Sequence, residues 1–475
     1  MVFSSVVFLF WFLPIFFLLY FVSPEKIKNY FILAGSILFY SWGGPKFIFA
    51  ILFTTILDYI LVRTMFKAER KKWVYLLISL TINLGLLFYF KYFNFFIDNF
   101  NGIWYPLTGN NLYIEKIILP IGISFYTFES ITYIVDVYRG QHKPLDKFSD
   151  YLLYILFFPK LIAGPIIRFG DFGHQIKDRQ SQDTADMKLA GLMRFIIGLS
   201  KKVLLANIFG ETAHHIYDVL DPAQHSTGIL WIASFAYTMQ IYFDFSGYSD
   251  MAIGLAQMMG FVIPENFNFP YISANITEFW RRWHISLGTW MKNYLYIPLG
   301  GNKYGNRKMY RNLFIVFLLS GLWHGASWNY IIWGIIHGLF LIADKLFLLK
   351  LSEKLPRILF VFFTLFIVNL TRVIFRTENL DELKTILYKM FVFTDADTGD
   401  FVISNQFLAI SVIGLFISLS GLFSFWYNKT QHTVQLFVSD NSKKWIFTIG
   451  CMILGLIALS HVIASDFNPF IYFRF

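Results

Sequence analysis

The chain has 475 residues, of which 56% are hydrophobic and 15% are charged. Soluble domains carry about 25% charged residues, so this composition excludes an ordinary soluble enzyme and predicts an integral membrane protein. The formal net charge of +10 is explained by basic loops on one side of a membrane and requires no nucleic acid. The single cysteine, Cys451, excludes a disulfide within the chain and a metal site built from cysteines.

Uncharged runs long enough to cross about 30 Å of hydrocarbon as helices recur along the chain. They cover residues 1–22, 73–90, 312–343, 401–428 and 445–465. The first run lacks the basic start and the small-residue cleavage site of a signal peptide, so we expect it to remain as a membrane span. Two further segments, 151–165 and 285–299, are short and interrupted by Pro, Gly or Lys, which favours re-entrant helices packed inside protein.

Together these segments predict about eleven to thirteen membrane-spanning or re-entrant helices. No linker divides the chain and no internal repeat is visible, so we expect one all-α polytopic membrane domain over residues 1–475. Basic residues gather in 63–72, 138–143, 301–311, 350–357 and around 441–444, whereas 394–400 is acidic. Because cytoplasmic loops are enriched in Lys and Arg, we expect the N-terminus and the C-terminal tail 466–475 on the extracytoplasmic side.

The stretch 275–301 combines tryptophans with basic residues. Arg281, Arg282 and His284 are set among Trp280, Trp283 and Trp290. One interpretation is an interfacial helix anchored at the lipid headgroups by its Trp and Arg side chains. The other is the cytoplasmic entrance of a site in which arginine holds an anionic donor, because the guanidinium pairs well with phosphate.

A second candidate is His324, near the middle of the run 312–343 and flanked by small residues. Small residues let helices approach closely, so His324 could simply pack. Alternatively, burial would keep its imidazole neutral and able to accept a proton. His337 is more simply interpreted as a core residue.

Two further groups of polar residues are ambiguous. In the aromatic stretch 240–254, Asp244, Ser246 and Asp250 could hydrogen-bond to the histidines or cap a broken helix. His214 and His215 belong to "HHIYD", one residue short of the HHxxxD box of soluble acyltransferases, and we expect them at the surface of a polar loop.

The longer motifs resemble a known family. "FWRRWHISLGTWMKNYLYIPLGG" (279–301), followed by "SGLWHGASW" (320–328), is similar to the membrane-bound O-acyltransferase (MBOAT) family. "ISFYTFESITYIVDVYRG" (123–140), "FFPKLIAGPIIR" (157–168) and "YFDFSGYSDMAIG" (242–254) resemble its bacterial branch, which serves alginate O-acetylation, peptidoglycan O-acetylation and teichoic-acid D-alanylation. The likeness extends over essentially the whole chain.

The resemblance implies helices surrounding a tunnel through the membrane, with the donor entering from the cytoplasm and the acceptor from outside. It assigns His324 as the catalytic residue and His284 as the second motif residue, which helps to hold the donor or stabilise the oxyanion. Acetyl-CoA is the implied donor, and no bound cofactor or metal is expected. The residues that we expect to bind the donor or line the tunnel are Trp280, Arg281, Arg282, Trp323, Asp244 and Asn275.

The terminal "FIYFRF" resembles the C-terminal motif of a small membrane peptide of D-alanylation, whose tyrosine is proposed as an acyl carrier. Tyr472 would then carry acetyl, with His324 removing its phenolic proton; the alternative is an interfacial aromatic residue. An extracytoplasmic serine hydrolase-like partner would move the acetyl group to sugar. We expect peptidoglycan as acceptor first and an alginate-like exopolysaccharide second. A transporter or channel is the competing class, and a catalytically silent scaffold is a third interpretation.

Overall fold

The computed structural model describes residues 1–219, 225–377, 379–393, 403–422, 441–465 and 467–469. Their regular structure is helical, with one isolated antiparallel bridge between Phe267 and Trp283. They form two compact units, one made of Met1–Thr184 with Ala256–Pro264 and the other of Ala185–Leu255 with Glu265–Phe475. The predicted all-α class is confirmed; the single domain over 1–475 stays a prediction.

Six helical segments among the described residues are long and apolar enough to span a membrane. They are Ile48–Lys67, Lys72–Thr108, Trp328–Ser352, Arg357–Arg376, Asn405–Leu422 and Lys444–Ala464, and Phe8–Val22 is a shorter apolar helix. Large apolar side chains on these segments point outward; Ile446, for example, is 76% exposed. Such a surface is suited to lipid rather than to water.

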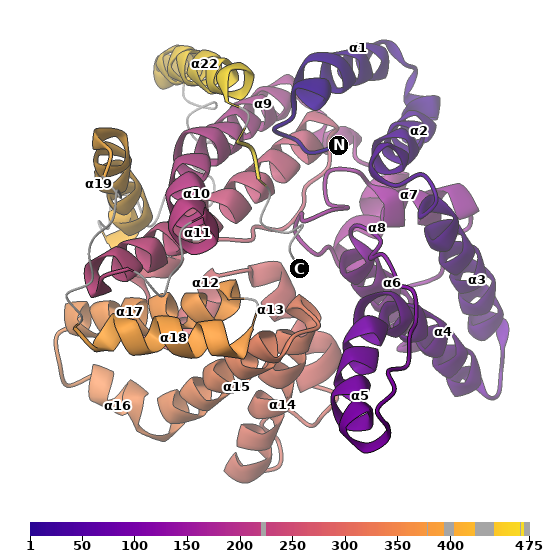
Figure 1. Cartoon of the computed structure of the whole chain (residues 1–475). Helices are drawn as coiled ribbons and strands as arrows, with labels where there is room; N and C mark the ends of the chain where they lie inside the picture. The colour runs from indigo at the N-terminus through magenta and orange to yellow at the C-terminus, as the bar shows by residue number, and fades with distance from the viewer. Residues whose placement is uncertain (220–224, 378, 394–402, 423–440, 466, 470–475) are drawn as a thin grey trace. The chain divides into compact units, whose positions relative to one another are not determined.

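The first unit is a set of helices, several of which pack against helices close to them in the sequence. Its elements are η1 (Phe8–Phe12), α1 (Leu13–Val22), α2 (Glu25–Gly43), α3 (Ile48–Lys67), α4 (Lys72–Leu87), η2 (Phe88–Tyr92), α5 (Phe93–Thr108), α6 (Ile123–Tyr138), α7 (Phe148–Leu156), α8 (Phe169–Lys177) and η3 (Gln180–Gln182). Helices α3, α4 and α6 pack against one another, and α2 packs against α7 (Figure 1).

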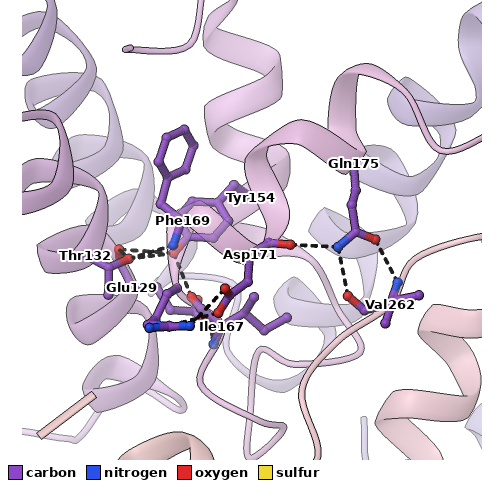
Figure 2. A network of polar contacts seen from close by, with 9 residues as sticks. Glu129, Thr132, Tyr154, Ile167, Phe169, Asp171, Gln175 and Val262 are labelled. Atoms are coloured by element: carbon purple, nitrogen blue, oxygen red, sulfur yellow. Dashed lines mark hydrogen bonds and ion pairs between the residues drawn. The ribbon is translucent and has the colours of Figure 1, made fainter. Parts of the chain in front are cut away.

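Helix α7 is short, as its sequence predicts, and the chain continues as turns and extended backbone from Phe157 to Arg168. Figure 2 shows how side chains hold this irregular segment and the start of α8. The hydroxyl of Tyr154 donates to the carbonyl of Ile167 at 2.8 Å, and the N–H of Phe169 donates to Thr132 Oγ1 at 3.1 Å. These side chains satisfy backbone groups that a helix would otherwise satisfy internally.

The second unit contains the motif histidines. Its elements are α9 (Ala185–Ser200), η4 (Lys201–Ala206), α10 (Asn207–His214), η5 (His215–Val219), α11 (Thr227–Met258), η7 (Pro270–Ile272), α12 (Ile276–Arg282), α13 (Ile285–Met291), η8 (Lys292–Tyr296), α14 (Asn306–His324), α15 (Trp328–Ala343), η9 (Asp344–Leu348), α16 (Leu349–Ser352), α17 (Arg357–Arg376), α18 (Leu380–Phe391), α19 (Asn405–Leu419), η10 (Ser420–Leu422) and α22 (Asn441–Ala464). Helix α14 packs against α15, and α15 packs against α17 (Figure 1).

The second unit corrects two predictions made from sequence. It also shows that the uncharged run 312–343 holds two helices, since α14 ends at His324 and α15 begins at Trp328. Helix α11 is continuous, so Ser246 caps no broken helix. His214 and His215 are helical rather than part of a loop, because the helix that starts at Asn207 continues through them.

Candidate active site

The backbone around His284 is held by a short two-stranded contact. Trp283 and Phe267 form the antiparallel bridge, and the N–H of Ile285 donates to the carbonyl of Asn266 at 3.0 Å. His284 lies between α12 and α13 with φ 47° and ψ 53°, a left-handed conformation that is uncommon for residues other than glycine. Surrounding contacts must stabilise this conformation, and it turns the imidazole into the protein, where His284 is 1% exposed.

The His284 ring has one satisfied nitrogen. Nδ1 lies 3.0 Å from Asn266 Oδ1, which also accepts from Ser286 Oγ at 2.9 Å, while Asn266 Nδ2 donates to Ser249 Oγ at 3.1 Å. Since an amide oxygen only accepts, Nδ1 carries the hydrogen and Nε2 of the neutral ring carries a lone pair. None of the described residues gives this buried Nε2 a hydrogen bond.

The indole of Trp323 lies next to both motif histidines. Its ring centroid is 6.0 Å from that of His284 and 5.0 Å from that of His324. His324 is the last residue of α14, is 7% exposed, and has the rings of Trp333 and Phe375 edge-on at 5.1 and 5.3 Å. Two motifs about forty residues apart in sequence therefore place their imidazoles beside one tryptophan.

His337 has partners on both ring nitrogens. Trp280 Nε1 donates to His337 Nδ1 at 3.3 Å, and Nε2 lies 3.1 Å from Thr371 Oγ1. This pairing leaves no nitrogen for a substrate, which agrees with the interpretation of His337 as a core residue. Trp280, expected at the tunnel, lies against His337 and Trp333, with ring centroids 5.2 and 5.5 Å away.

The two adjacent arginines have different surroundings. Arg282 is buried and donates to Glu278 Oε1 from Nε at 3.0 Å and from Nη2 at 2.9 Å, and from Nη1 to the carbonyl of Asn268 at 3.1 Å. Arg281 is exposed. A donor phosphate would therefore meet Arg281 more readily than Arg282, whose donors already serve the protein.

Glu278 and Asn275 together cap the start of α12. Asn275 Oδ1 accepts from the N–H of Glu278 at 2.7 Å, and Glu278 Oε2 accepts from the N–H of Ala274 at 2.9 Å. Burial works to raise the pKa of the Glu278 carboxyl, but hydrogen bonds from Ala274, Arg357 and Arg282 hold that pKa below its usual range. Asn275, expected among the donor-binding residues, thus has a local role in the helix start.

Asp244 is buried and ion-paired. Its Oδ1 lies 2.9 Å from Nζ of Lys202, and the two side chains are 1% and 3% exposed. This ion pair links Asp244 to η4, and it does not involve either histidine. Tyr472, the expected carrier, lies outside the described residues.

Comparisons with known proteins identify the family. Residues 145–375 match the model of the membrane-bound O-acyltransferase family. The probable alginate O-acetylase AlgI of Azotobacter vinelandii is 39% identical over all of both chains. This chain belongs to the MBOAT family. The family resemblance found in the sequence is confirmed, and the chain is a multi-pass, membrane-bound O-acyltransferase.

Two further relatives of this MBOAT chain carry different names. The probable alginate O-acetylase AlgI of Pseudomonas aeruginosa is 45% identical over 83% of this chain and 75% of its own length. The peptidoglycan O-acetyltransferase of Helicobacter pylori is 34% identical over 100% of this chain and 98% of its own length. The likeness to both groups spans the region that holds the two histidines.

Sequence reasoning missed two polar residues of this MBOAT site. Asn266, which fixes the His284 ring, is a single amide in "PENFNFP", and nothing in that stretch marks it. Lys202 did carry a signal, because it is the second of two lysines directly before the apolar stretch "VLLANIF" (203–209), and ionisable residues in apolar helices are costly. Its partner Asp244 was singled out, but the pairing depends on tertiary packing.

Proposed function

We propose that this chain transfers acetyl groups from acetyl-CoA, a cytoplasmic thioester, across the membrane for O-acetylation of an alginate-like exopolysaccharide. The observation that carries the proposal is the placement of His284 and His324 beside Trp323 in a buried site. In such water-poor surroundings one imidazole can accept the proton of an attacking hydroxyl while the other positions the donor.

The choice of polysaccharide rests on the names of the relatives. Relatives at 39–45% identity over 83–100% of this chain are named probable alginate O-acetylases, whereas the peptidoglycan O-acetyltransferase is 34% identical. The similarities therefore support an alginate-like exopolysaccharide, the second acceptor expected from the sequence, better than peptidoglycan, the first. A polymer of uronic acids or a similar exopolysaccharide is the acceptor class that we propose.

In the proposed reaction the Tyr472 hydroxyl attacks the thioester carbonyl carbon. His324 accepts the phenolic proton, the new C–O bond forms, the C–S bond breaks, and the thiolate of coenzyme A leaves and takes up a proton. A general base contributes about 10²–10⁴-fold in rate, and the phenol needs one because its ordinary pKa is about 10.

The geometry of His284 favours one of its two expected roles. Asn266 holds the hydrogen on Nδ1, so Nε2 of the neutral ring can accept a hydrogen bond but cannot donate one to an oxyanion. The pantetheine arm of the donor carries amide N–H groups that such a lone pair can hold. We assign His284 to positioning the donor rather than to stabilising the oxyanion.

The proposal places the enzyme in a bacterial inner membrane with both termini extracytoplasmic. The acetyl group would leave Tyr472 for an extracytoplasmic serine hydrolase-like partner, which passes it to sugar. The basic segments and the aromatic tail in the sequence support this orientation.

The test uses purified protein in vesicles with radiolabelled acetyl-CoA outside and tyrosine-bound acetyl measured by mass spectrometry. The wild-type chain is expected to gain label at Tyr472, and His324→Ala is expected to remain folded and gain none. A transporter would instead move intact solute with no covalent transfer. Full acetylation in His324→Ala would refute the mechanism.

A further inference from the structure

The ion pair between Lys202 and Asp244 lies in the protein interior, where burying a charge costs free energy. Both side chains are at most 3% exposed, and Asp244 lies on α11 among apolar neighbours. Burying two charges costs several kcal/mol per ion, roughly, and well-packed apolar side chains often replace such pairs without loss of stability. A buried pair in a membrane protein is therefore a reason to look for a group that needs the charge.

That group is the start of the C-terminal tail. Lys202 Nζ donates to the backbone carbonyl of Pro469, and Asn207 Nδ2 donates to the carbonyl of Phe467 at 3.2 Å. The Phe467 ring stacks on His214, with centroids 5.8 Å apart and planes 30° apart. Three side chains from η4 and α10 thus contact Phe467 and Pro469 of the tail.

The two bound carbonyls are two residues apart. Groups at i and i+2 of an extended chain point to the same side, so Lys202 and Asn207 can bind one side of an extended backbone. Asn207 Nδ2 also lies 3.5 Å from the side-chain Oδ1 of Asn468. Asp244 contributes by compensating the charge of the buried ammonium, which removal of the carboxylate would leave unpaired with any acid.

The same stretch of α11 also contacts the histidine site. Phe245 follows Asp244 directly and lies edge-on to the His284 ring, with centroids 4.7 Å apart. Tyr472 follows Pro469 by three residues, and an extended chain of that length spans about 10 Å. A fixed Pro469 therefore restricts the volume that the Tyr472 hydroxyl can reach.

We infer that Lys202, Asn207 and Asp244 form a binding site for the extended backbone of the C-terminal tail, here termed the tail clamp, which fixes the starting point from which Tyr472 reaches the histidines. The inference rests on the proposed function for the role of Tyr472. The clamp itself depends only on contacts of residues 467–469 with η4, α10 and α11. It makes the tail an internal peptide ligand of the second unit.

The first measurement is tail accessibility, which does not depend on catalysis. In a full-length Cys451→Ser background, Asn468→Cys supplies one thiol for a maleimide reagent. Lys202→Met with Asp244→Asn removes both charges, so that no carboxylate is left buried alone. Labelling at residue 468 is expected to be at least tenfold faster in this double variant.

The matched control is Lys444→Met, which breaks the more exposed pair with Asp186 elsewhere in the second unit. Its labelling rate and its elution from a size-exclusion column should equal those of the parent. Equal labelling in the clamp variant and the parent, with both proteins folded, would overturn the tail clamp. Faster labelling in Lys444→Met as well would overturn it too, because the effect would then not be specific to the clamp.

The second measurement is acetyl transfer in the same proteins without the Asn468→Cys change. The clamp variant is expected to lose at least tenfold in the rate of Tyr472 labelling, and Asn207→Ala to lose less. If the wild-type chain gains no label at Tyr472 while the accessibility result holds, the carrier proposal fails and the tail clamp stands. If Tyr472 is labelled equally fast in parent and clamp variant, the clamp has no part in positioning, and this inference fails while the carrier proposal stands.

Discussion

Nδ1 of His284 lies 3.0 Å from Oδ1 of Asn266, and this contact decides which imidazole nitrogen carries the hydrogen. The amide oxygen is in turn fixed by Ser286 Oγ at 2.9 Å, and the amide nitrogen by Ser249 Oγ at 3.1 Å. Three polar side chains thus hold one ring in one tautomer, with Nε2 left as an acceptor. Such orientation by an outer partner is a common requirement of imidazole chemistry.

The first prediction concerns Asn266→Ala. Loss of the Oδ1 acceptor frees the ring to change tautomer and leaves a buried N–H unpaired, so we expect acetyl transfer to fall by about 10²-fold. Initial rates at several acetyl-CoA concentrations will show whether KM rises more than kcat falls, as expected if His284 holds the donor. Asn266→Asp keeps an acceptor oxygen and should recover part of the rate, which a purely structural role for Asn266 would not predict.

Variants of His324 and His337 distinguish a histidine that acts in catalysis from one that only packs in the core. His324→Ala should reduce acetyl transfer by about 10²–10⁴-fold with little change in melting temperature. His337→Leu leaves the Trp280 indole N–H and Thr371 Oγ1 without their partner, and should cost about 1–3 kcal/mol of stability. Activity per folded molecule should survive in His337→Leu. An equal loss of activity in both variants would contradict the assignment of His337 to the core.

The adjacent arginines should respond differently to removal. Arg282→Ala breaks three hydrogen bonds to Glu278 and Asn268 and leaves the Glu278 carboxylate with less compensation, so the melting temperature should fall. Arg281→Ala should leave the melting temperature unchanged, because this side chain is exposed. If Arg281 holds the donor phosphates, its variant should raise KM for acetyl-CoA and leave the KM for a short acetyl thioester that lacks phosphates unaffected.

The sequence predicted the membrane class correctly, and it singled out both histidines, for a physical reason. Long uncharged runs report burial in lipid directly, and histidines in apolar runs are rare enough to be conspicuous. The continuity of α11 was harder to predict, because Gly247 suggests a break. An added Cβ there would meet the carbonyl of Gly198 at 2.7 Å, so this glycine permits close packing of α9 on α11 rather than a bend.

The site partners of the histidines could not be predicted in the same way. Asn266 reaches His284 through a bridge between residues far from any periodic pattern, and Lys202 meets Asp244 across two helices. Such pairings depend on how helices pack, which composition and spacing do not encode. For Asn275 the sequence did contain a local signal, because Asn followed three residues later by Glu is typical of a helix start. We had instead expected Asn275 to bind the donor.

The break between α14 and α15 yields the last prediction. At Gly321 an added Cβ would meet the carbonyl oxygen of Tyr330 at 2.3 Å, so the two helix backbones are in direct contact three residues before His324. Gly321→Ala must separate the helices, and overpacking of this kind costs about 1–3 kcal/mol. We expect a lower melting temperature and, because His324 ends α14, slower acetyl transfer in the molecules that remain folded.

Gly450 on α22 offers the matched control. No atom lies within 4 Å of a Cβ added there, so Gly450→Ala should be tolerated, and alanine raises helix stability by about 1 kcal/mol relative to glycine. Thermal unfolding followed by tryptophan fluorescence, with transfer rates measured on the same samples, compares the two variants. If Gly321→Ala behaved like Gly450→Ala in both measurements, the close contact between α14 and α15 would not be what fixes His324. If only its stability fell, the position of His324 would depend on the aromatic rings of Trp323, Trp333 and Phe375 rather than on the spacing of the helices.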